Sequence, residues 1–269
     1  MSIITISRGS YSKGKEVAEK VAQKLGYECI SRDIILEASE EFNIPEIKLI
    51  RAIHDAPSIL DRLQHKKEKY ISYVNVALLQ HFKKDNIVYH GLAGHFFVKG
   101  ISHVLKVRII ADLEDRVKTE MEREGISRVE ALHQLKKDDE ERRKWSESLY
   151  GINTWEPSIY DQVLHIHKLS IDDAVDMICH TAGLKHFQST LESKKALEDL
   201  VLSAEVKAAL MEIDHRLKVS AKDDTVYVKT KASPLQQSTL VRDITKKVMT
   251  IPGVKDVKIE VGTIVPFSE

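Results

Sequence analysis

Seven residues near the start of the chain have the types and spacing needed to hold phosphate. The run from Gly9 to Lys15 fits G-x-x-x-x-G-K and follows a β-branched run at residues 3–6. A loop between a strand and a helix can turn backbone N–H groups toward phosphate oxygens, and the helix N-terminus adds a positive dipole end. Lys15 would then reach the terminal phosphates. An ordinary strand-to-helix turn with exposed lysines is the alternative.

The residue after this lysine departs from the usual phosphate-loop pattern. Glu16 stands where a Ser or Thr normally ligates magnesium. A carboxylate could bind magnesium through water, but it also brings negative charge close to phosphate. Ser12 offers a hydroxyl from a different position. We therefore expect any magnesium near Ser12 or Glu16 and leave the choice between them open.

Strands and helices alternate along the chain around this loop. Val17, Val21 and Leu25 recur at helical spacing, and Gly26 is expected to end that helix. Further helices are predicted at residues 33–42, 71–82, 115–124, 127–144 and 171–182, and strands at 86–90, 104–111 and 163–167. Such alternation predicts an α/β fold with a largely parallel sheet flanked by helices.

The pattern changes near residue 185. We expect a polar linker at residues 186–195, which divides a domain at 1–185 from a smaller α+β domain at 196–265. In the smaller domain we predict helices at 196–211 and 235–250 and strands at 217–221, 225–231 and 254–261. Asp223 and Asp224 supply the turn between its first two strands.

Composition excludes several classes of protein. The 269 residues include 41 Lys+Arg and 41 Asp+Glu, a balance that argues against binding nucleic acid through a broad basic surface. Cys29 and Cys179 lie far apart, which disfavours a disulfide framework or a cysteine zinc site. We see no transmembrane stretch and no signal peptide, and we expect a cytoplasmic location.

The first two thirds of the chain resemble a known family. Residues 4–8, Ile-Thr-Ile-Ser-Arg, and 12–18, Ser-Lys-Gly-Lys-Glu-Val-Ala, are similar to the opening of cytidylate-kinase-like proteins. This group belongs to the nucleoside-monophosphate-kinase branch of the P-loop kinase fold, and Glu16 is usual for it. The resemblance continues at residues 107–118, 121–127, 157–161 and 168–174, and it covers about residues 1–182.

The resemblance implies cofactors and site residues. ATP and Mg²⁺ are the implied cofactors, and the implied phosphate-binding residues are Arg8, Gly9, Ser12, Lys13, Gly14, Lys15 and Glu16. Arg142 and Arg143, in the basic stretch 136–144, would close over the nucleotides as a lid and act with Lys15 in catalysis. A solvated helix surface would show the same mixed charges. Arg32 and Asp33 would face the acceptor, although Asp33 is an equally good helix N-cap.

One segment departs from the family pattern. At residues 86–95, His90 and Gly91 stand where cytidylate kinases have the Arg and Asp of a Gly-Arg-Asp motif. His90 could still donate to an acceptor phosphate when protonated. His90, His95 and His103 could alternatively form a metal site, or they could be ordinary structural histidines.

The C-terminal residues resemble a BON domain. The resemblance rests on Val219, on the hairpin at residues 223–228, and on residues 251–261. It implies a module that binds a ligand or a protein partner. The apolar stripe at residues 70–82 is compatible with a homodimer, although core packing explains it equally simply.

Two functions remain after this reading. The first is ATP-dependent phosphoryl transfer to a small acceptor, with a nucleoside monophosphate such as CMP as the expected substrate and the C-terminal module as a regulator. The alternative is a nucleotide-binding sensor with little turnover that signals through that module. A kinase of another metabolite or of a protein is a third reading.

Overall fold

The computed structural model describes residues 2–9, 12–31, 33–43, 64–91 and 94–263. The strands are β1 (Ile3–Arg8), β2 (Glu28–Ile30), β3 (Ile87–His90), β4 (Val104–Ala111), β5 (Gln162–Ile166), β6 (Lys218–Lys222), β7 (Thr225–Ala232) and β8 (Asp256–Thr263). The helices are α1 (Gly14–Leu25), α2 (Asp33–Glu41), α4 (Gln64–Phe82), α5 (Gly94–Phe97), α6 (Leu113–Glu124), α7 (Arg128–Tyr150), α8 (Ile171–Ala182), α9 (Leu191–Leu210) and α10 (Gln237–Val248).

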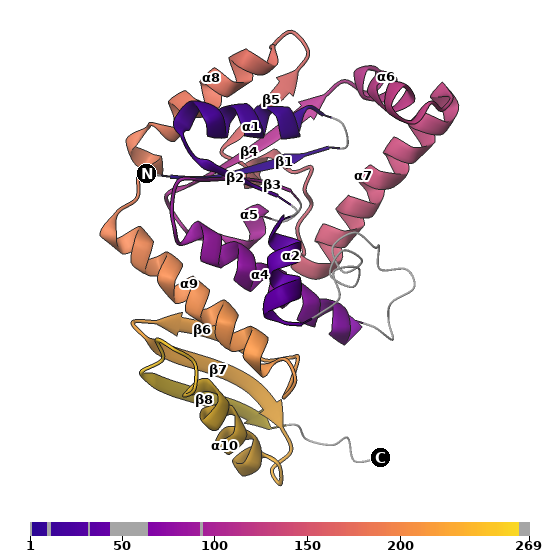
Figure 1. Ribbon diagram of the computed structural model, residues 1–269. Helices are drawn as coiled ribbons and strands as arrows, with labels where there is room; N and C mark the ends of the chain where they lie inside the picture. The colour runs from indigo at the N-terminus through magenta and orange to yellow at the C-terminus, as the bar shows by residue number, and fades with distance from the viewer. Residues whose placement is uncertain (1, 10–11, 32, 44–63, 92–93, 264–269) are drawn as a thin grey trace.

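Five parallel strands form the central sheet, in the order β2-β3-β1-β4-β5. The inner strands β1, β3 and β4 are largely buried, and their side chains alternate between two apolar cores, whereas the outer strands β2 and β5 are more exposed. Ile4 and Ile6 of β1 point into the core under α1 and α8, whereas Ile3 points into the core against α4. Figure 1 shows α1 and α8 above this sheet and α4 and α9 below it. The predicted α/β fold with a parallel sheet is confirmed.

Three further strands form a second sheet, in the order β6-β7-β8. β6 and β7 are antiparallel and are joined by Asp223 and Asp224, whose φ angles of 53° and 62° suit a tight hairpin turn. β8 then pairs with β7 in parallel. The helix–strand–strand–helix–strand order and the turn predicted from the sequence are therefore confirmed.

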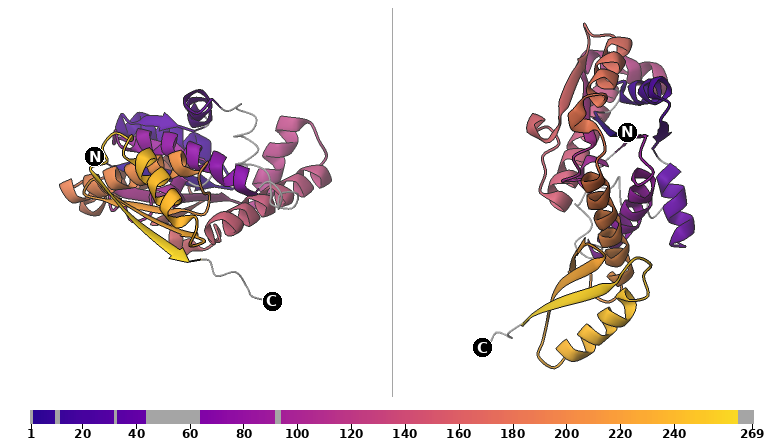
Figure 2. Two further views of the ribbon diagram at one scale, coloured as in Figure 1. Left: turned by 90° about the horizontal axis from the view of Figure 1, so that it is seen from below. Right: turned by 90° about the vertical axis from the view of Figure 1, so that its left-hand side faces the viewer.

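Helix α9 packs in the cores of both sheets. Leu197 and Val201 pack in the core under the central sheet, and Val206 and Leu210 pack in the core of the second sheet. Figures 1 and 2 show α9 between α4 and the three-stranded sheet at the lower end of the molecule. The two units therefore share one helix rather than a flexible connection.

Several boundaries differ from the sequence predictions. α9 begins at Leu191, inside the predicted linker, because Thr190 and Ser193 form a capping box that starts the helix among polar residues. β2 and α5 were not predicted, and α4 and α7 are longer than predicted. The apolar stripe of α4 packs against α2 and α9, with Val74, Leu78 and Phe82 buried, so core packing accounts for it.

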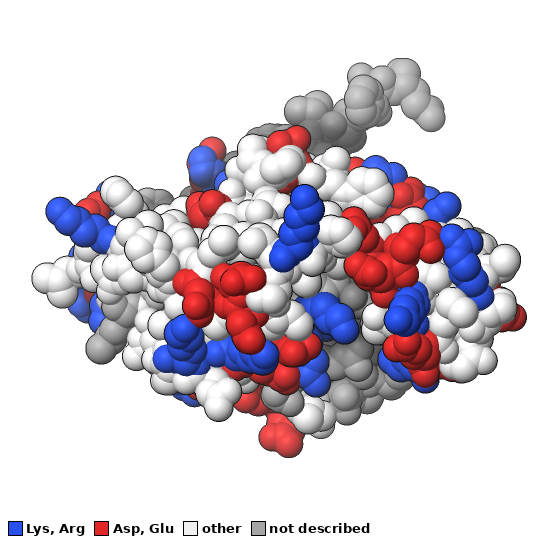
Figure 3. Space-filling view, turned by 90° about the horizontal axis from the view of Figure 1, so that it is seen from above, with Lys and Arg blue, Asp and Glu red and all other residues white. Residues whose placement is uncertain are grey.

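Charges of both signs share the surface above the central sheet. Figure 3 shows Lys and Arg interspersed with Asp and Glu over this face. Among them, Lys20 and Lys24 of α1 pair with Asp172 and Asp176 of α8. No helix in the described ranges is both long and apolar enough to cross a bilayer.

Candidate phosphate-binding site

The predicted phosphate loop lies between β1 and α1, at the carboxyl edge of the parallel sheet. Residues 10 and 11 lie outside the described chain, but the positions on either side of them are defined. The Ser12 hydroxyl is buried and donates to the carbonyl oxygen of Gly9 at 3.0 Å. Lys13 adopts a left-handed conformation with φ 66°, and α1 begins at the next residue. The strand-loop-helix order expected from the motif is present.

Gly14 allows the loop to pass close to the end of β1. A Cβ atom at this position would lie 2.7 Å from the Cβ of Arg8 and 2.8 Å from its Cδ. No side chain fits at these distances unless β1 or α1 moves. The second glycine of the motif is therefore required by packing between the loop and the strand.

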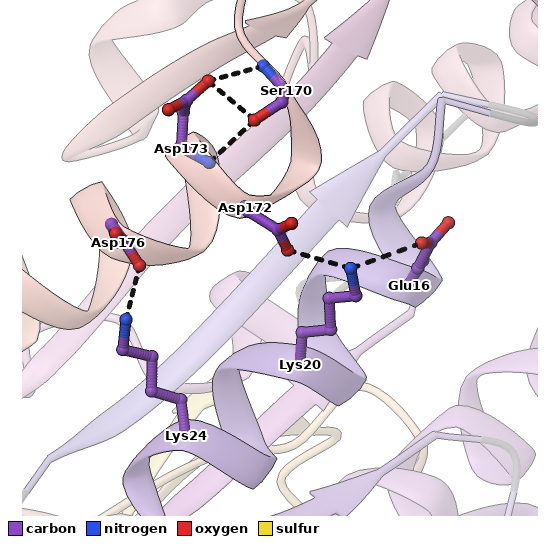
Figure 4. Close-up of polar contacts among 7 residues, drawn as sticks. All are labelled: Glu16, Lys20, Lys24, Ser170, Asp172, Asp173 and Asp176. Carbon is purple, nitrogen blue, oxygen red and sulfur yellow. Dashed lines mark hydrogen bonds and ion pairs between the residues drawn. The ribbon is translucent and has the colours of Figure 1, made fainter.

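Lys15 and Glu16 pair with neighbouring residues of α1, and neither is among the described residues that line the cavity beside this loop. The Lys15 ammonium lies 3.6 Å from Glu19, and the Glu16 carboxylate lies 3.8 Å from Lys20, which also binds Asp172 (Figure 4). The buried face of α1 is formed by Gly14, Val17, Ala18, Val21 and Ala22. Positions 15 and 16 lie outside that face, so helix geometry turns both side chains toward solvent. The Lys15 ammonium thus pairs with a neighbour on its own helix, and the phosphate contact expected of it stays a prediction.

A cavity of about 670 Å³ opens beside the loop, at the ends of β1 and β4. Its cationic lining comes from Arg108, Arg116 and Lys136, and Ser12 contributes a hydroxyl. The full lining in the described chain is Gly9, Ser12, Arg108, Ile110, Ala111, Leu113, Arg116, Lys136, Asp139, Glu140 and Trp155. The cavity therefore combines apolar residues with three cations and two carboxylates, a lining that suits a ligand that carries both a ring and phosphate.

Arg116 lies close to the loop backbone at Gly9. Its guanidinium carbon lies 3.6 Å from where a Cβ on Gly9 would stand. Its Nη2 donates to the Asp139 carboxylate at 2.7 Å, and only 11% of the Arg116 side chain is exposed. The ion pair fixes the guanidinium between α6 and α7, where it faces both the loop and the cavity.

Arg108 is positioned by Tyr160. Its Nη1 donates to the Tyr160 hydroxyl at 3.2 Å, and its guanidinium carbon lies 5.6 Å from the centre of the Tyr160 ring. The Tyr160 hydroxyl in turn donates to the Thr154 carbonyl oxygen at 3.0 Å and lies 3.2 Å from the Ser7 hydroxyl. This buried chain of hydrogen bonds holds Arg108 at the floor of the cavity.

The two predicted lid arginines lie on α7, next to the cavity. Arg143 donates to Glu140 and Glu147, and its guanidinium carbon lies 5.8 Å from the centre of the Trp155 ring. The hydrogen bond from Arg143 lowers the pKa of Glu140. Because Glu140 and Trp155 line the cavity, Arg143 lies at its rim. Arg142 belongs to the same turn, where its carbonyl oxygen accepts a bond from Ser146.

Of the predicted acceptor residues, the structure describes His90 and the backbone of Asp33. Asp33 begins α2, and Arg32 lies outside the described residues. His90 ends β3 and is buried, and it is paired in register with Ile6 of β1. His90 is therefore at the same edge of the sheet as the loop, as a residue facing an acceptor would need to be.

The three histidines considered as a metal site do not come together. His90 lies at the carboxyl end of β3. His103 precedes β4 at the opposite edge of the sheet, where its backbone carbonyl oxygen accepts a hydrogen bond from the Ile3 N–H. His103 is fully buried and lies 3.3 Å from Asp85. His90 is level with Ile6 of β1 and His103 is level with Ile3, so three residues of extended strand, about 10 Å, separate the two histidines. One ion therefore cannot bind both. The reading of these histidines as a metal site is wrong.

His95 has a structural environment of its own. Its ring centre lies 5.0 Å from that of Tyr160. Burial, aided by the charges of Arg108 and Lys106, lowers the pKa of His95 to about 3. His95 is therefore a neutral residue that packs behind the floor of the cavity.

Sequence reasoning missed Arg108, Arg116 and Lys136 as cavity residues. Arg108 and Arg116 flank the end of β4, and in a parallel sheet the carboxyl ends of neighbouring strands meet at one edge. The signal was therefore present in the order of elements. The sequence did not show which way each side chain points.

Comparison with known proteins covers this part of the chain. Residues 3–168 match the model of a family described as the Cytidylate kinase-like family. The chain is 25% identical over 189 residues to the cytidylate kinase of Sulfolobus acidocaldarius, a match that covers 70% of this chain and 98% of that protein. It is 26% identical over 191 residues to the cytidylate kinase of Pyrobaculum aerophilum, covering 69% and 97% of the two chains.

A solved structure also resembles the same part of the chain. An uncharacterized protein from Eubacterium ventriosum aligns with a TM-score of 0.51 and 21% identity, over 68% of this chain and 98% of that one. At this identity the likeness concerns the fold alone. The family match ends at residue 168, so α9 and the three-stranded sheet lie beyond it.

Proposed function

The chain belongs to the cytidylate kinase-like family, and we propose that it transfers a phosphoryl group from ATP to a nucleoside monophosphate such as CMP. The observation that carries this proposal is the cavity at the ends of β1 and β4, which is lined by Arg108, Arg116 and Lys136. Phosphoryl transfer needs charge stabilisation and positioning more than covalent chemistry. Fixed guanidinium groups in a partly apolar cavity supply both.

In this proposal Arg116 replaces the loop lysine as the main phosphate contact. Its guanidinium is already held beside Gly9 by Asp139, so little order is lost when phosphate binds. Lys136 adds a second charge from α7. Lys15, paired with Glu19 on the outside of α1, contributes at most to the general field of the site.

Arg143 is the lid residue that the arrangement favours. It lies at the rim on Trp155 and is held by Glu140 and Glu147. A phosphate with more than one negative charge competes well for an arginine that is held only by partly exposed carboxylates. Arg142 and Arg143 are proposed to close on the transferring group from α7.

Magnesium, which accompanies ATP in phosphoryl transfer, would neutralise charge between the phosphates. Of the two sites suggested by the sequence, Ser12 fits better because it lines the cavity, whereas Glu16 faces Lys20. Asp139 and Glu140 supply carboxylates on the opposite wall. The acceptor would lie toward the end of β3 and the start of α2, near His90 and Asp33.

The C-terminal residues are proposed to form a BON-like regulatory module at 196–265, attached to a kinase domain at 1–185. The order of its elements, α9-β6-β7-α10-β8, supports this assignment. A second cavity, of about 610 Å³, lies in it and carries charges of both signs from Asp214, Arg216, Lys231 and Asp243. We propose this cavity as the place where the module takes a polar ligand.

A nucleotide sensor with little turnover is the second candidate. It is favoured by the outward position of Lys15 and by α9, which packs in the cores of both sheets and could pass a change from one to the other. Such a protein would bind ATP at the same cavity without an acceptor.

The two candidates are separated by turnover with a panel of acceptors. ADP formation by the full chain would be measured with ATP, Mg²⁺ and CMP, dCMP, UMP or AMP in turn, and ATP binding would be measured by calorimetry. A kinase gives ADP formation that depends on at least one acceptor. Saturable ATP binding with no acceptor-dependent ADP would support the sensor, and absence of ATP binding would contradict both.

A further inference from the structure

Two histidines and two aspartates gather at the exposed end of β5, outside the cavity. His165 lies in β5, and His167 follows its last residue, so both project from the same side of this strand. Asp112 and Asp115 come from the start of α6, which follows the neighbouring strand β4. The pair of elements brings imidazole and carboxylate groups together from positions about fifty residues apart in the sequence.

The distances within this cluster lie on either side of the spacing between the ligands of one metal ion. The Nδ1 atom of His167 lies 2.8 Å from Oδ2 of Asp112 and 3.7 Å from Oδ2 of Asp115. All three ligand atoms lie within 4.8 Å of one another. Ligands bound tetrahedrally at about 2.0–2.2 Å from zinc are about 3.3–3.6 Å apart, so only small side-chain movements would bring these atoms around one ion.

Asp112 is oriented by a second histidine. Its Oδ1 atom lies 3.0 Å from Nε2 of His165, while its Oδ2 atom faces His167. The two imidazole rings are nearly parallel, with centres 5.9 Å apart. Asp112 occupies the N-cap position of α6, yet its carboxylate makes no capping bond there and is turned toward the imidazoles. This resembles the way second partners hold metal ligands in position.

The contribution of these ion pairs to folding stability does not explain why the four side chains lie together. The four side chains are between 43% and 64% exposed, and ion pairs with this much exposure contribute little to folding. Two carboxylates near one another also repel unless a cation lies between them. A divalent ion would remove the repulsion and use the imidazole nitrogen.

We propose that Asp112, Asp115 and His167 form a binding site for a divalent transition-metal ion such as Zn²⁺, with His165 as a positioning residue for Asp112. One nitrogen and two carboxylate oxygens leave a fourth position for water. An imidazole ligand favours Zn²⁺ or Co²⁺ over Mg²⁺, which prefers oxygen ligands alone. The site is distinct from the magnesium that accompanies ATP.

An ion at this site would stabilise the segment that forms one wall of the cavity. Ala111, Leu113 and Arg116 line the cavity, and they alternate in sequence with Asp112 and Asp115. An ion bound to both aspartates and to His167 would therefore fix the first turn of α6 to the end of β5. The site would stabilise the position of Arg116 without entering the cavity itself.

The test is metal binding by the full chain, freed of metal with a chelator and without nucleotide. Co²⁺ would be followed by its visible absorption and Zn²⁺ by calorimetry. We expect one ion per chain, with His167→Gln weakening Co²⁺ binding roughly 100-fold and His165→Gln roughly 10-fold. His180→Gln removes an exposed histidine of α8 outside the cluster and serves as the matched control.

Thermal unfolding in chelator separates loss of the site from loss of the fold. All three variants should unfold at the temperature of the original chain in chelator. Zn²⁺ should raise that temperature equally for the original chain and for His180→Gln, should raise it for His165→Gln only at roughly 10-fold higher concentration, and should leave His167→Gln nearly unchanged at the concentrations that stabilise the original chain. The proposal is overturned if Co²⁺ binds the original chain without saturation, if His167→Gln binds it equally well, or if Mg²⁺ competes at the same concentration as Co²⁺. None of these readouts depends on kinase activity.

Discussion

Helices α1 and α6 start in equivalent places but present their charges differently. Each follows a neighbouring strand of the parallel sheet, β1 or β4, and each has a basic residue in its first turn. Lys15 of α1 is 64% exposed and pairs with Glu19, whereas Arg116 of α6 is 11% exposed and faces the cavity. A basic residue just after a strand end is therefore not enough to identify a phosphate contact. Whether its charge faces the cavity depends on which side of the helix carries it and on what packs against that side.

The largest expected effect is the loss of Arg116. Arg116→Ala removes the guanidinium beside the loop and its ion pair with Asp139. We expect the rate of phosphoryl transfer to fall on the order of 100-fold, as is typical for a fixed donor to a charged transition state. Steady-state ADP formation measures it. If Arg116→Ala retains near-full kcat/KM, the cavity wall formed by α6 is not the phosphate site.

Gly14→Ala tests the packing of the other helix. The added methyl group would lie 2.7 Å from the Cβ of Arg8, so β1 and α1 must separate. We expect a loss of roughly 1–3 kcal/mol in the free energy of unfolding, the usual effect of overpacking. Urea denaturation measures it. Gly262→Ala, where the nearest atom is 3.4 Å away on a flexible lysine, is the control and should cost less.

Protonation of His95, which packs behind the floor of the cavity, should lower the stability of the fold at acid pH. Burial and Arg108 lower its pKa from 6.5 to about 3. The unfolded chain therefore binds one more proton than the folded chain between these values, so this residue destabilises the fold progressively as pH falls below 6.5. From pH 6.5 to pH 5 we expect a loss of about 2 kcal/mol from this group alone.

The measurement for His95 is the free energy of unfolding across this range of pH. His95→Leu should show a shallower loss than the original chain between pH 6.5 and pH 5, whatever its stability at neutral pH. Equal slopes in the two proteins would mean that His95 becomes protonated without cost, and that its surroundings are more polar than the structure indicates.

The smallest expected effect is that of Lys15. Lys15→Ala removes an exposed ion pair with Glu19, and such pairs contribute little. We expect the KM for ATP and the kcat to change less than about twofold, against roughly 100-fold for Arg116→Ala. A large loss of kcat in Lys15→Ala would instead mean that this side chain turns inward when nucleotide binds.

Local patterns in the sequence gave the elements with good accuracy. Gly26 ends α1 in a left-handed conformation as predicted, and the Asp223-Asp224 turn joins β6 to β7. Both depend on a single residue or pair whose backbone preference is strong. β2 escaped prediction because three residues, Glu28–Ile30, are too few to show an alternating pattern.

The site was predicted only in part, for a related reason. The loop was correctly placed between a strand and a helix, yet Arg108 and Tyr160, 52 residues apart, meet only in the folded chain. The same is true of Asp112 and His167. Side chains from separate strands of a parallel sheet become neighbours through the order of strands, which a single sequence does not display.

The sequence by itself determined the alternation of strands and helices, the hairpin turn at Asp223-Asp224, and the glycines and capping residues that bound the helices. Each of these follows from interactions within a few residues. Only the tertiary structure decided which charges face the cavity, how α9 shares two cores, and that His103 pairs with Asp85 at the far edge from His90. These depend on packing between distant segments, where the direction of each side chain is set by what buries its neighbours.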